Sequence, residues 1–139
     1  PALPEAERRY ADRIATASEA LLGVINDILD YSKLEAEAVD LDPQPFDPAE
    51  TARGAAAIVE SQCEAKGLTL TLDLDDGLPA ALMGDEGRIR QVLLNFLSNA
   101  VKFTVSGEVR LASRWADGRL RVAVSDSGIG VSPEKIDAL

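Results

Sequence analysis

Residues 91–104 read QVLLNFLSNAVKFT and form the most informative stretch of this 139-residue chain. The stretch has the apolar spacing of a helix, yet it carries two asparagines four residues apart, Asn95 and Asn99. Asparagine is a poor helix former because its amide competes for backbone hydrogen bonds. The two amides therefore either lie in water or point at a ligand that needs oxygen donors, and spacing alone leaves both interpretations open.

This stretch belongs to a predicted helix that starts after the capping residue Asp85. Its apolar stripe is predicted to contain Ile89, Leu93, Phe96 and Ala100. A solvated face would more usually carry Glu, Lys or Gln, which favour helix. Two amide oxygens in line with an ammonium group instead suit a hard cation and the phosphates that it neutralises. This second, polar stripe consists of Arg88, Gln91, Asn95, Asn99 and Lys102.

A second motif, VSDSGIGV, occupies residues 124–131. Asp126 follows a predicted strand, and Gly128 and Gly130 come next at alternate positions. Glycine lets a ligand approach the main chain closely. Asp-Ser-Gly is also an ordinary turn, so this motif is weak alone and becomes a strong signal only in combination with the Asn/Asn/Lys helix.

Residues 4–36 are predicted to form one long helix with a heptad seam. Leu22, Ile25 and Leu29 widen its apolar stripe, as in a helix of a bundle. A single helix cannot bury such a seam, so it needs a partner from a second copy or from another segment. The seam consists of Tyr10, Ile14, Ala17, Leu21, Val24, Ile28 and Tyr31.

The remaining segments alternate between helix and strand. Three prolines in residues 39–50 exclude a helix or a central strand before Asp47, and they allow a short edge strand around Val39, Leu41 and Phe46. Asp47, with Pro48 and Glu50 behind it, predicts a capping box and a helix that ends at Gly67. Mostly antiparallel strands are expected at residues 68–74, 81–83, 109–111 and 120–124, with a hairpin at residues 117–118 and another helix from residue 132.

These elements predict an α+β chain: a long bundle helix in residues 1–38, then a partial two-layer α/β sandwich in residues 39–139. The net charge of −10 disfavours nucleic acid and polybasic membrane contacts. One cysteine, Cys63, and the lack of a membrane-length apolar run favour a cytoplasmic segment with no direct membrane contact, whether or not the parent protein is anchored.

Three stretches together carry a resemblance to sensor histidine kinases. Residues 84–104 resemble the N-box of these kinases with its lead-in, and VSDSGIGV resembles their G1-box. INDILDYSKLEA, residues 25–36, resembles the second helix of the dimerisation and histidine-phosphotransfer hairpin. The two boxes are also similar to those of gyrase-type topoisomerases, heat-shock chaperones and mismatch-repair ATPases, but those families leave the heptad helix unexplained.

The resemblance implies a site for ATP and Mg²⁺. Asn99 would give its amide oxygen to Mg²⁺, Asn95 would support the same face, and Lys102 would face phosphate oxygens. Asp126 would accept a hydrogen bond from the adenine amino group. The other nucleotide-binding residues implied by the resemblance are Phe103, Gly128 and Gly130.

The resemblance also implies an ATP-dependent protein-histidine kinase that phosphorylates its own histidine and then an aspartate on a response-regulator receiver domain. A homodimer through the helical hairpin is expected, with residues 5–14 facing the receiver domain. The chain contains no histidine, so the phosphoacceptor lies outside it and the segment is expected to be inactive alone. The alternative is a catalytically inactive dimeric scaffold that signals by binding partners.

Overall fold

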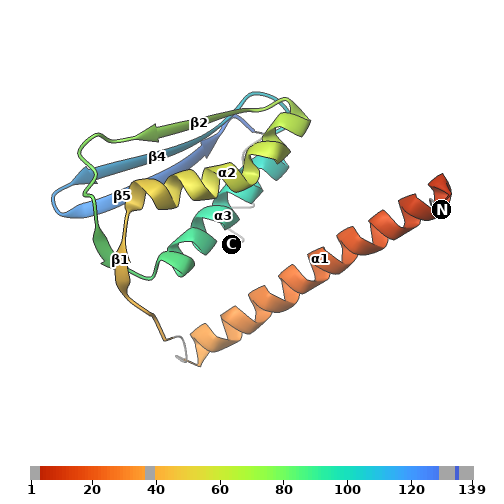
Figure 1. Ribbon diagram of the computed structural model, residues 1–139, viewed down its shortest axis with the longest axis horizontal. Coiled ribbons are helices and arrows are strands. Elements are labelled where there is room, and N and C mark those ends of the chain that lie inside the picture. The colour runs from red at the N-terminus through yellow and green to blue at the C-terminus, as the bar shows by residue number, and fades with distance from the viewer. Residues whose placement is uncertain (1–3, 37–39, 129–133, 135–139) are drawn as a thin grey trace. The chain divides into compact units, whose positions relative to one another are not determined.

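The computed structural model describes residues 4–36, 40–128 and Glu134 (Figure 1). The chain separates into two compact units, divided between Leu41 and Asp42. The first unit holds helix α1 (Glu5–Glu35). The predicted α+β class is confirmed by the order of the second unit: β1 (Gln44–Phe46), α2 (Pro48–Lys66), β2 (Thr69–Leu74), β3 (Leu82–Gly84), α3 (Glu86–Phe103), β4 (Glu108–Ala116) and β5 (Arg119–Asp126).

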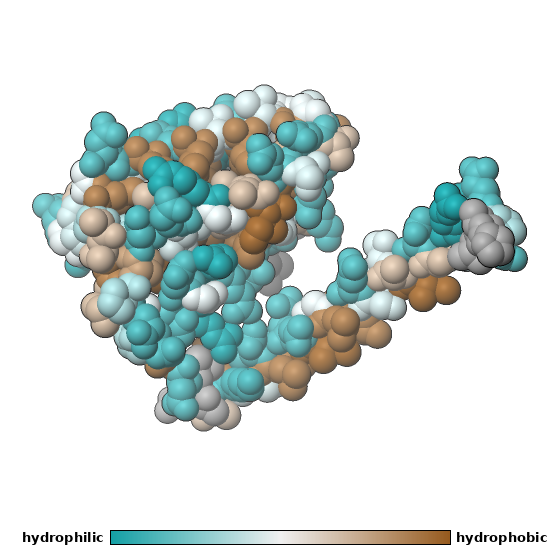
Figure 2. All heavy atoms as spheres, in the orientation of Figure 1, coloured by the Kyte–Doolittle hydropathy of each residue, from teal (hydrophilic) through white to brown (hydrophobic). Residues whose placement is uncertain are grey.

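Helix α1 confirms the long helix predicted from the heptad spacing. Glu5 and Glu7 in its first turn and Lys33 in its last turn complement the helix dipole. None of its residues is buried, and its large apolar side chains are exposed, for example Leu21 at 61% and Ile28 at 58%. Figure 2 shows apolar residues gathered along one side of the helix. No helix in the described part of the chain is both long and apolar enough to cross a membrane.

The main sheet has the strand order β2–β4–β5, and Figure 1 shows α2 and α3 on one of its faces. Strand β4 pairs antiparallel with β5, with Leu111 opposite Val124. Strand β2 pairs parallel with β4, with Leu72 opposite Leu111. The parallel pair is the exception to the mostly antiparallel prediction. It arises because the chain crosses over through β3 and α3 between the two strands, which a short turn could not achieve.

The core lies between this sheet and the two helices. Leu97 of α3 and Val109 and Leu111 of β4 are completely buried. Helix α2 contributes mainly small residues, such as Ala55, which let it lie close to α3. Cys63 of α2 is also buried, and burial raises the pKa of its thiol, so it behaves as a small apolar side chain.

A second, two-stranded sheet pairs β1 with β3, with Phe46 opposite Leu82. Of the residues expected in the edge strand, Phe46 lies in β1, Leu41 precedes it and is exposed, and Val39 lies outside the described residues. An added Cβ at Gly84 would lie 2.9 Å from the Phe46 ring. Glycine at this position therefore lets the ring pack against the strand.

The predicted caps and the hairpin are confirmed. The Asp47 side chain accepts from the backbone N–H of Ala49 at 2.9 Å, and Gly67 ends α2 with φ 68°. The other half of the expected capping box differs, because the Glu50 carboxylate contacts Arg53 at 2.6 Å. Asp117 (φ 53°) and Gly118 (φ 70°) join β4 to β5 in the left-handed conformation that tight hairpins favour. The helix expected from Ser132 lies outside the described residues apart from Glu134.

Candidate nucleotide-binding site

Of the predicted polar stripe on helix α3, Arg88 and Gln91 are half-buried and the other three side chains are exposed. The cap of this helix is Asp85, which accepts from the N–H of Arg88 at 3.1 Å and, through its other oxygen, from the N–H of Asp42 at 3.1 Å. The hydrogen bonds from Asp42 and Arg88 hold the pKa of Asp85 below its usual range. The cap therefore ties the start of α3 to the chain that enters the second unit.

The buried side of α3 differs from the prediction at one position. Leu93 and Ala100 are buried as expected, but Phe96 is 59% exposed and Leu97 takes the buried place at 0%. Residues three and four positions after Leu93 both lie near its face, so spacing allowed either one. Packing against the sheet and α2 selects Leu97 because the buried side of α3 continues to Val101.

Asn95 and Asn99 are both exposed. Within the described part of the chain, neither side-chain amide has a hydrogen-bond partner. Neither amide is committed to a packing role, so both oxygens are available to a ligand. Lys102, further along α3, is exposed as well, and its Nζ lies 5.3 Å from the centroid of the Phe103 ring.

The end of α3 is held by a residue that the sequence analysis did not single out. Lys66, the last residue of α2, donates through Nζ to the carbonyl oxygens of Val101 and, at 3.3 Å, of Lys102. A cation at a helix C-terminus is favourable because the last carbonyls lack partners within the helix. Nothing in the sequence links residues 66 and 101, so only the fold reveals this contact.

Asp126 ends β5, and Gly128 forms a tight turn with it. The Gly128 N–H donates to Asp126 Oδ1 at 2.8 Å. A Cβ added to Gly128 would lie 2.7 Å from that same oxygen and 2.8 Å from the carbonyl oxygen of Phe103. No side chain fits here, so the glycine brings the Asp126 turn against the end of α3. Gly130, the other glycine of the motif, lies outside the described residues.

A second contact joins the same two segments. Ser127 Oγ accepts from the N–H of Glu108 at 3.0 Å, and the Ser127 N–H donates to the Glu108 carbonyl at 3.1 Å. Gly107 has φ 112°, and an added Cβ would lie 2.1 Å from Ser127 Oγ. The loop after α3 and the turn after β5 are therefore locked together. The structure thus brings the end of the QVLLNFLSNAVKFT helix to the Asp126–Gly128 turn.

Helix α3 offers too few oxygen ligands to bind a metal ion by itself, so a cation here would also need oxygens from a bound ligand. Among the described residues, no group of three or more His, Cys, Asp or Glu side chains could hold a metal ion. Mg²⁺ is commonly bound by one or two protein oxygens together with phosphate oxygens and water. An exposed amide oxygen such as that of Asn99 fits this pattern.

Two other features of the second unit are less suited to a nucleotide. A groove of 530 Å³ between α3 and β5 is lined by apolar side chains, among them Val92, Phe96, Leu120 and Val122, which offer phosphates no partner. Phe96 is exposed because it faces this open groove.

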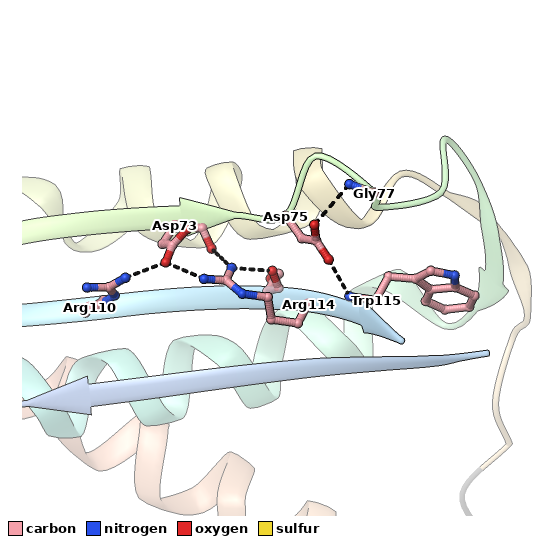
Figure 3. Close-up of polar contacts among 7 residues, drawn as sticks. Asp73, Asp75, Gly77, Arg110, Arg114 and Trp115 are labelled. Atoms are coloured by element: carbon pink, nitrogen blue, oxygen red, sulfur yellow. Dashed lines mark hydrogen bonds and ion pairs between the residues drawn. The ribbon is translucent and has the colours of Figure 1, made fainter. Parts of the chain in front are cut away.

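The other feature is a cluster of charges on β2 and β4 (Figure 3). Asp73 bridges Arg110 and Arg114, which lowers the pKa of Asp73 and raises that of Arg114. Next to it, Asp75 accepts from the N–H groups of Trp115 at 3.0 Å and Gly77 at 3.1 Å, which lowers its pKa. These acids are already paired within the chain, so the cluster connects neighbouring strands.

Comparisons with known proteins identify the family of the segment that carries these residues. Residues 84–139 match the family described as histidine kinase-, DNA gyrase B- and HSP90-like ATPase. Over 98% of its length the chain is 39% identical to the sensor protein TorS of Escherichia coli strain K12, of which it spans 15%. It is 36% identical to full-length ShkA, crystallised with AMPPNP, with a TM-score of 0.82 over 96% of this chain and 29% of that one.

A third similarity supports the fold alone. The histidine kinase ThkA, crystallised in complex with the response regulator protein TrrA, is 23% identical, with a TM-score of 0.74 over 97% of this chain and 39% of that one. Residues 84–139 thus belong to the histidine kinase-, gyrase B- and HSP90-like ATPase family. Together with the preceding helix, the chain is homologous to sensor histidine kinases of two-component signalling over nearly its whole length.

Proposed function

We propose that this chain is the core segment of a sensor histidine kinase that binds ATP with Mg²⁺, phosphorylates a histidine outside this segment and passes the phosphoryl group to a response-regulator aspartate. In this proposal residues 1–38 are the second helix of the dimerisation and phosphotransfer domain, and residues 39–139 are the catalytic ATP-binding domain. The observation that carries it is the junction at Gly128, where no side chain fits between the Asp126 turn and the end of α3.

Each candidate residue has a role in this proposal. Asn99 supplies an amide oxygen to Mg²⁺, Asn95 extends the same polar face, and Lys102 faces the phosphates. Asp126 accepts from the adenine amino group, and we assign this role to Oδ2 because the Gly128 N–H holds Oδ1 within the turn. Phe103, Gly128 and Gly130 complete the nucleotide site.

Phosphoryl transfer depends on positioning and charge neutralisation rather than on covalent chemistry by the protein. Bound Mg²⁺ supplies most of the charge that offsets the phosphates. The chain has a net charge of −10, so it needs local cationic and amide groups such as Lys102 and Asn99 to hold an anion. We expect these residues to orient the nucleotide, while the acceptor histidine comes from outside residues 1–139.

The proposal includes two partners. A second copy would cover the exposed apolar seam of α1, because that seam contains large side chains that water solvates poorly. A receiver domain would contact residues 5–14. ThkA, which has the same fold, has been crystallised with a response regulator, and this supports the second partner only by analogy.

The alternative is a dimeric scaffold without kinase activity, which the absence of histidine from the chain keeps open. The two proposals differ in the full-length protein. A kinase requires a phosphoacceptor histidine outside residues 1–139, and a scaffold does not. Loss of autophosphorylation on removing that histidine would support the kinase.

The nucleotide site is tested by titrating ATP and GTP into the complete kinase by calorimetry. Asp126→Asn should lower ATP affinity about ten- to a hundredfold, because a charge-assisted hydrogen bond is lost. The wild type should prefer ATP strongly, since GTP has a carbonyl where ATP has the amino group. Asp117→Asn, the same change in the hairpin turn, is the control and should bind as the wild type does. Equal binding of ATP and GTP by the wild type would contradict the adenine site.

A further inference from the structure

Thr104, the residue that caps the C-terminal end of α3, carries a buried hydroxyl. The residue is 0% exposed, and its Oγ1 has no hydrogen-bond partner among the described residues. A buried hydroxyl without a partner is unfavourable, and valine would fill the same space without that penalty. The hydroxyl can therefore still take up a hydrogen bond that it does not make among the described residues of this structure.

The position of the hydroxyl indicates the partner. Thr104 Oγ1 lies 3.2 Å from the point where a Cβ of Gly128 would be, and Asp126 Oδ1 lies 2.7 Å from the same point. Both oxygens thus flank the same side of Gly128, and their separation cannot exceed the sum of these two distances. This upper limit of 5.9 Å is within the reach of a bridge through one water, and a shorter separation allows a direct hydrogen bond.

The chemistry of the two groups is complementary. Asp126 Oδ1 accepts one hydrogen bond, from the Gly128 N–H, and a carboxylate oxygen can accept two. Thr104 offers an unused donor beside it. The Phe103 carbonyl borders the same space, yet the Thr104 hydroxyl makes no hydrogen bond to it within the described part of the chain.

We propose that Thr104 is a positioning residue for the base site. In the nucleotide-bound protein its hydroxyl donates to the Asp126 carboxylate, directly or through one water, and so holds Oδ2 toward the base. This inference rests on the proposed function. It adds a link between Asp126 and the end of α3, which carries Lys102. This link would hold the phosphate-binding and base-binding ends of the site at a fixed distance from each other.

The test compares Thr104→Val with Thr104→Ser in the complete kinase. Valine keeps the shape and removes the hydroxyl, whereas serine keeps the hydroxyl. We expect Thr104→Val to lower ATP affinity about tenfold in calorimetry and to narrow the preference for ATP over GTP. Thr104→Ser should bind ATP close to the wild-type affinity. Ser106→Ala, which removes an exposed hydroxyl from the same loop, is the matched control.

Thermal unfolding of the nucleotide-free variants separates this role from a structural one. Thr104→Val should leave the unfolding midpoint unchanged or raise it, because it removes an unpaired buried hydroxyl. Wild-type affinity in the valine variant, an equal loss in the serine variant, or a lower midpoint for valine would each overturn the inference. A wild type that binds neither nucleotide would overturn the proposed function itself, and this inference with it.

Discussion

At the scale of single residues, the site depends on the absence of side chains as much as on their chemistry. Gly107 and Gly128 each occupy a place where a Cβ would collide with the neighbouring segment, at 2.1 Å from Ser127 Oγ and at 2.8 Å from the Phe103 carbonyl oxygen. These two glycines allow the loop after α3 and the turn after β5 to lie in contact. The end of α3, which carries the candidate residue Lys102, therefore lies against the Asp126 turn, although Lys102 and Asp126 are 24 positions apart in the sequence.

Asn99→Ala should separate catalysis from stability. Autophosphorylation by the complete kinase should fall by about tenfold or more, since even residues that only support a metal ligand cost that much. The free energy of unfolding should stay the same or rise by up to ~0.7 kcal/mol, because alanine is the better helix former. A radiolabel transfer assay over a range of Mg²⁺ concentrations measures the first effect, and urea unfolding measures the second.

Ser98→Ala, an exposed change on the same helix, is the control for Asn99→Ala and should retain activity. Full activity of the Asn99 variant at low Mg²⁺ would contradict a metal role for this amide.

At the scale of elements, the ends of the helices follow from a few side chains. Asp47 and Asp85 both accept from backbone N–H groups in the first turn of the helix that follows, and Gly67 ends α2 in the left-handed conformation. Each of these contacts joins residues that are close together in the sequence, so each can be predicted from the neighbouring residues. The contacts fix where α2 and α3 begin and where α2 ends, and Figure 1 shows these two helices covering one face of the sheet.

Removing the cap of α2 should lower stability without affecting nucleotide binding. Asp47→Ala should reduce the free energy of unfolding by about 1 kcal/mol, because two N–H groups lose their acceptor. Asp47→Ser should recover most of this loss, since serine caps nearly as well. Urea unfolding measures the difference, and equal stability of the alanine and serine variants would show that the cap does not contribute.

The seam of α1 should control self-association. Replacing Leu21 and Ile28 together by Glu puts two charges on the apolar side of the helix, so the complete kinase should become monomeric in sedimentation experiments. Thr16→Glu adds one charge to the polar side of the helix and should leave the assembly unchanged. A monomeric wild type would disprove assembly through this helix.

At the scale of the whole molecule, acidic residues dominate the charge, and the structure stabilises several of them in ionised form. The pKa of Asp73 is lowered by Arg114 and Arg110, and that of Asp75 by the backbone N–H groups of Trp115 and Gly77. In the unfolded chain these groups regain ordinary pKa values near 4. The folded state therefore binds fewer protons than the unfolded state at acidic pH.

Stability should consequently decrease as the pH falls from about 5 toward the lowered pKa values, and it should be fully present above about pH 5. The urea midpoint measured between pH 7 and pH 2.5 should show this decrease, and Asp73→Asn should make it shallower. High salt should weaken the part due to Asp73 more than the part due to Asp75, because the first depends on exposed ion pairs. A midpoint that rises on acidification would contradict this assignment.

Most of the local structure could be predicted from neighbouring residues. The heptad spacing predicts α1, the prolines and Asp47 predict where α2 begins, and the alternation of residues predicts β4 and β5. Helix periodicity alone also places Asn95, Asn99 and Lys102 on one face of α3, while their roles in binding stay a prediction. Each of these features depends on interactions within a few positions along the chain.

Other features depend on contacts between distant residues, and only the tertiary structure shows them. Two of them concern packing: the parallel pairing of β2 with β4 and the burial of Leu97 in place of Phe96. Two concern polar groups: the contact of Lys66 with the end of α3 and the buried Thr104 hydroxyl, which has no partner among the described residues. Helical spacing leaves two or three neighbouring positions equivalent, and backbone carbonyls carry no sequence signal. The packing of α2 and the sheet against α3 decides which of these helix positions is buried, because a well-packed core leaves few voids.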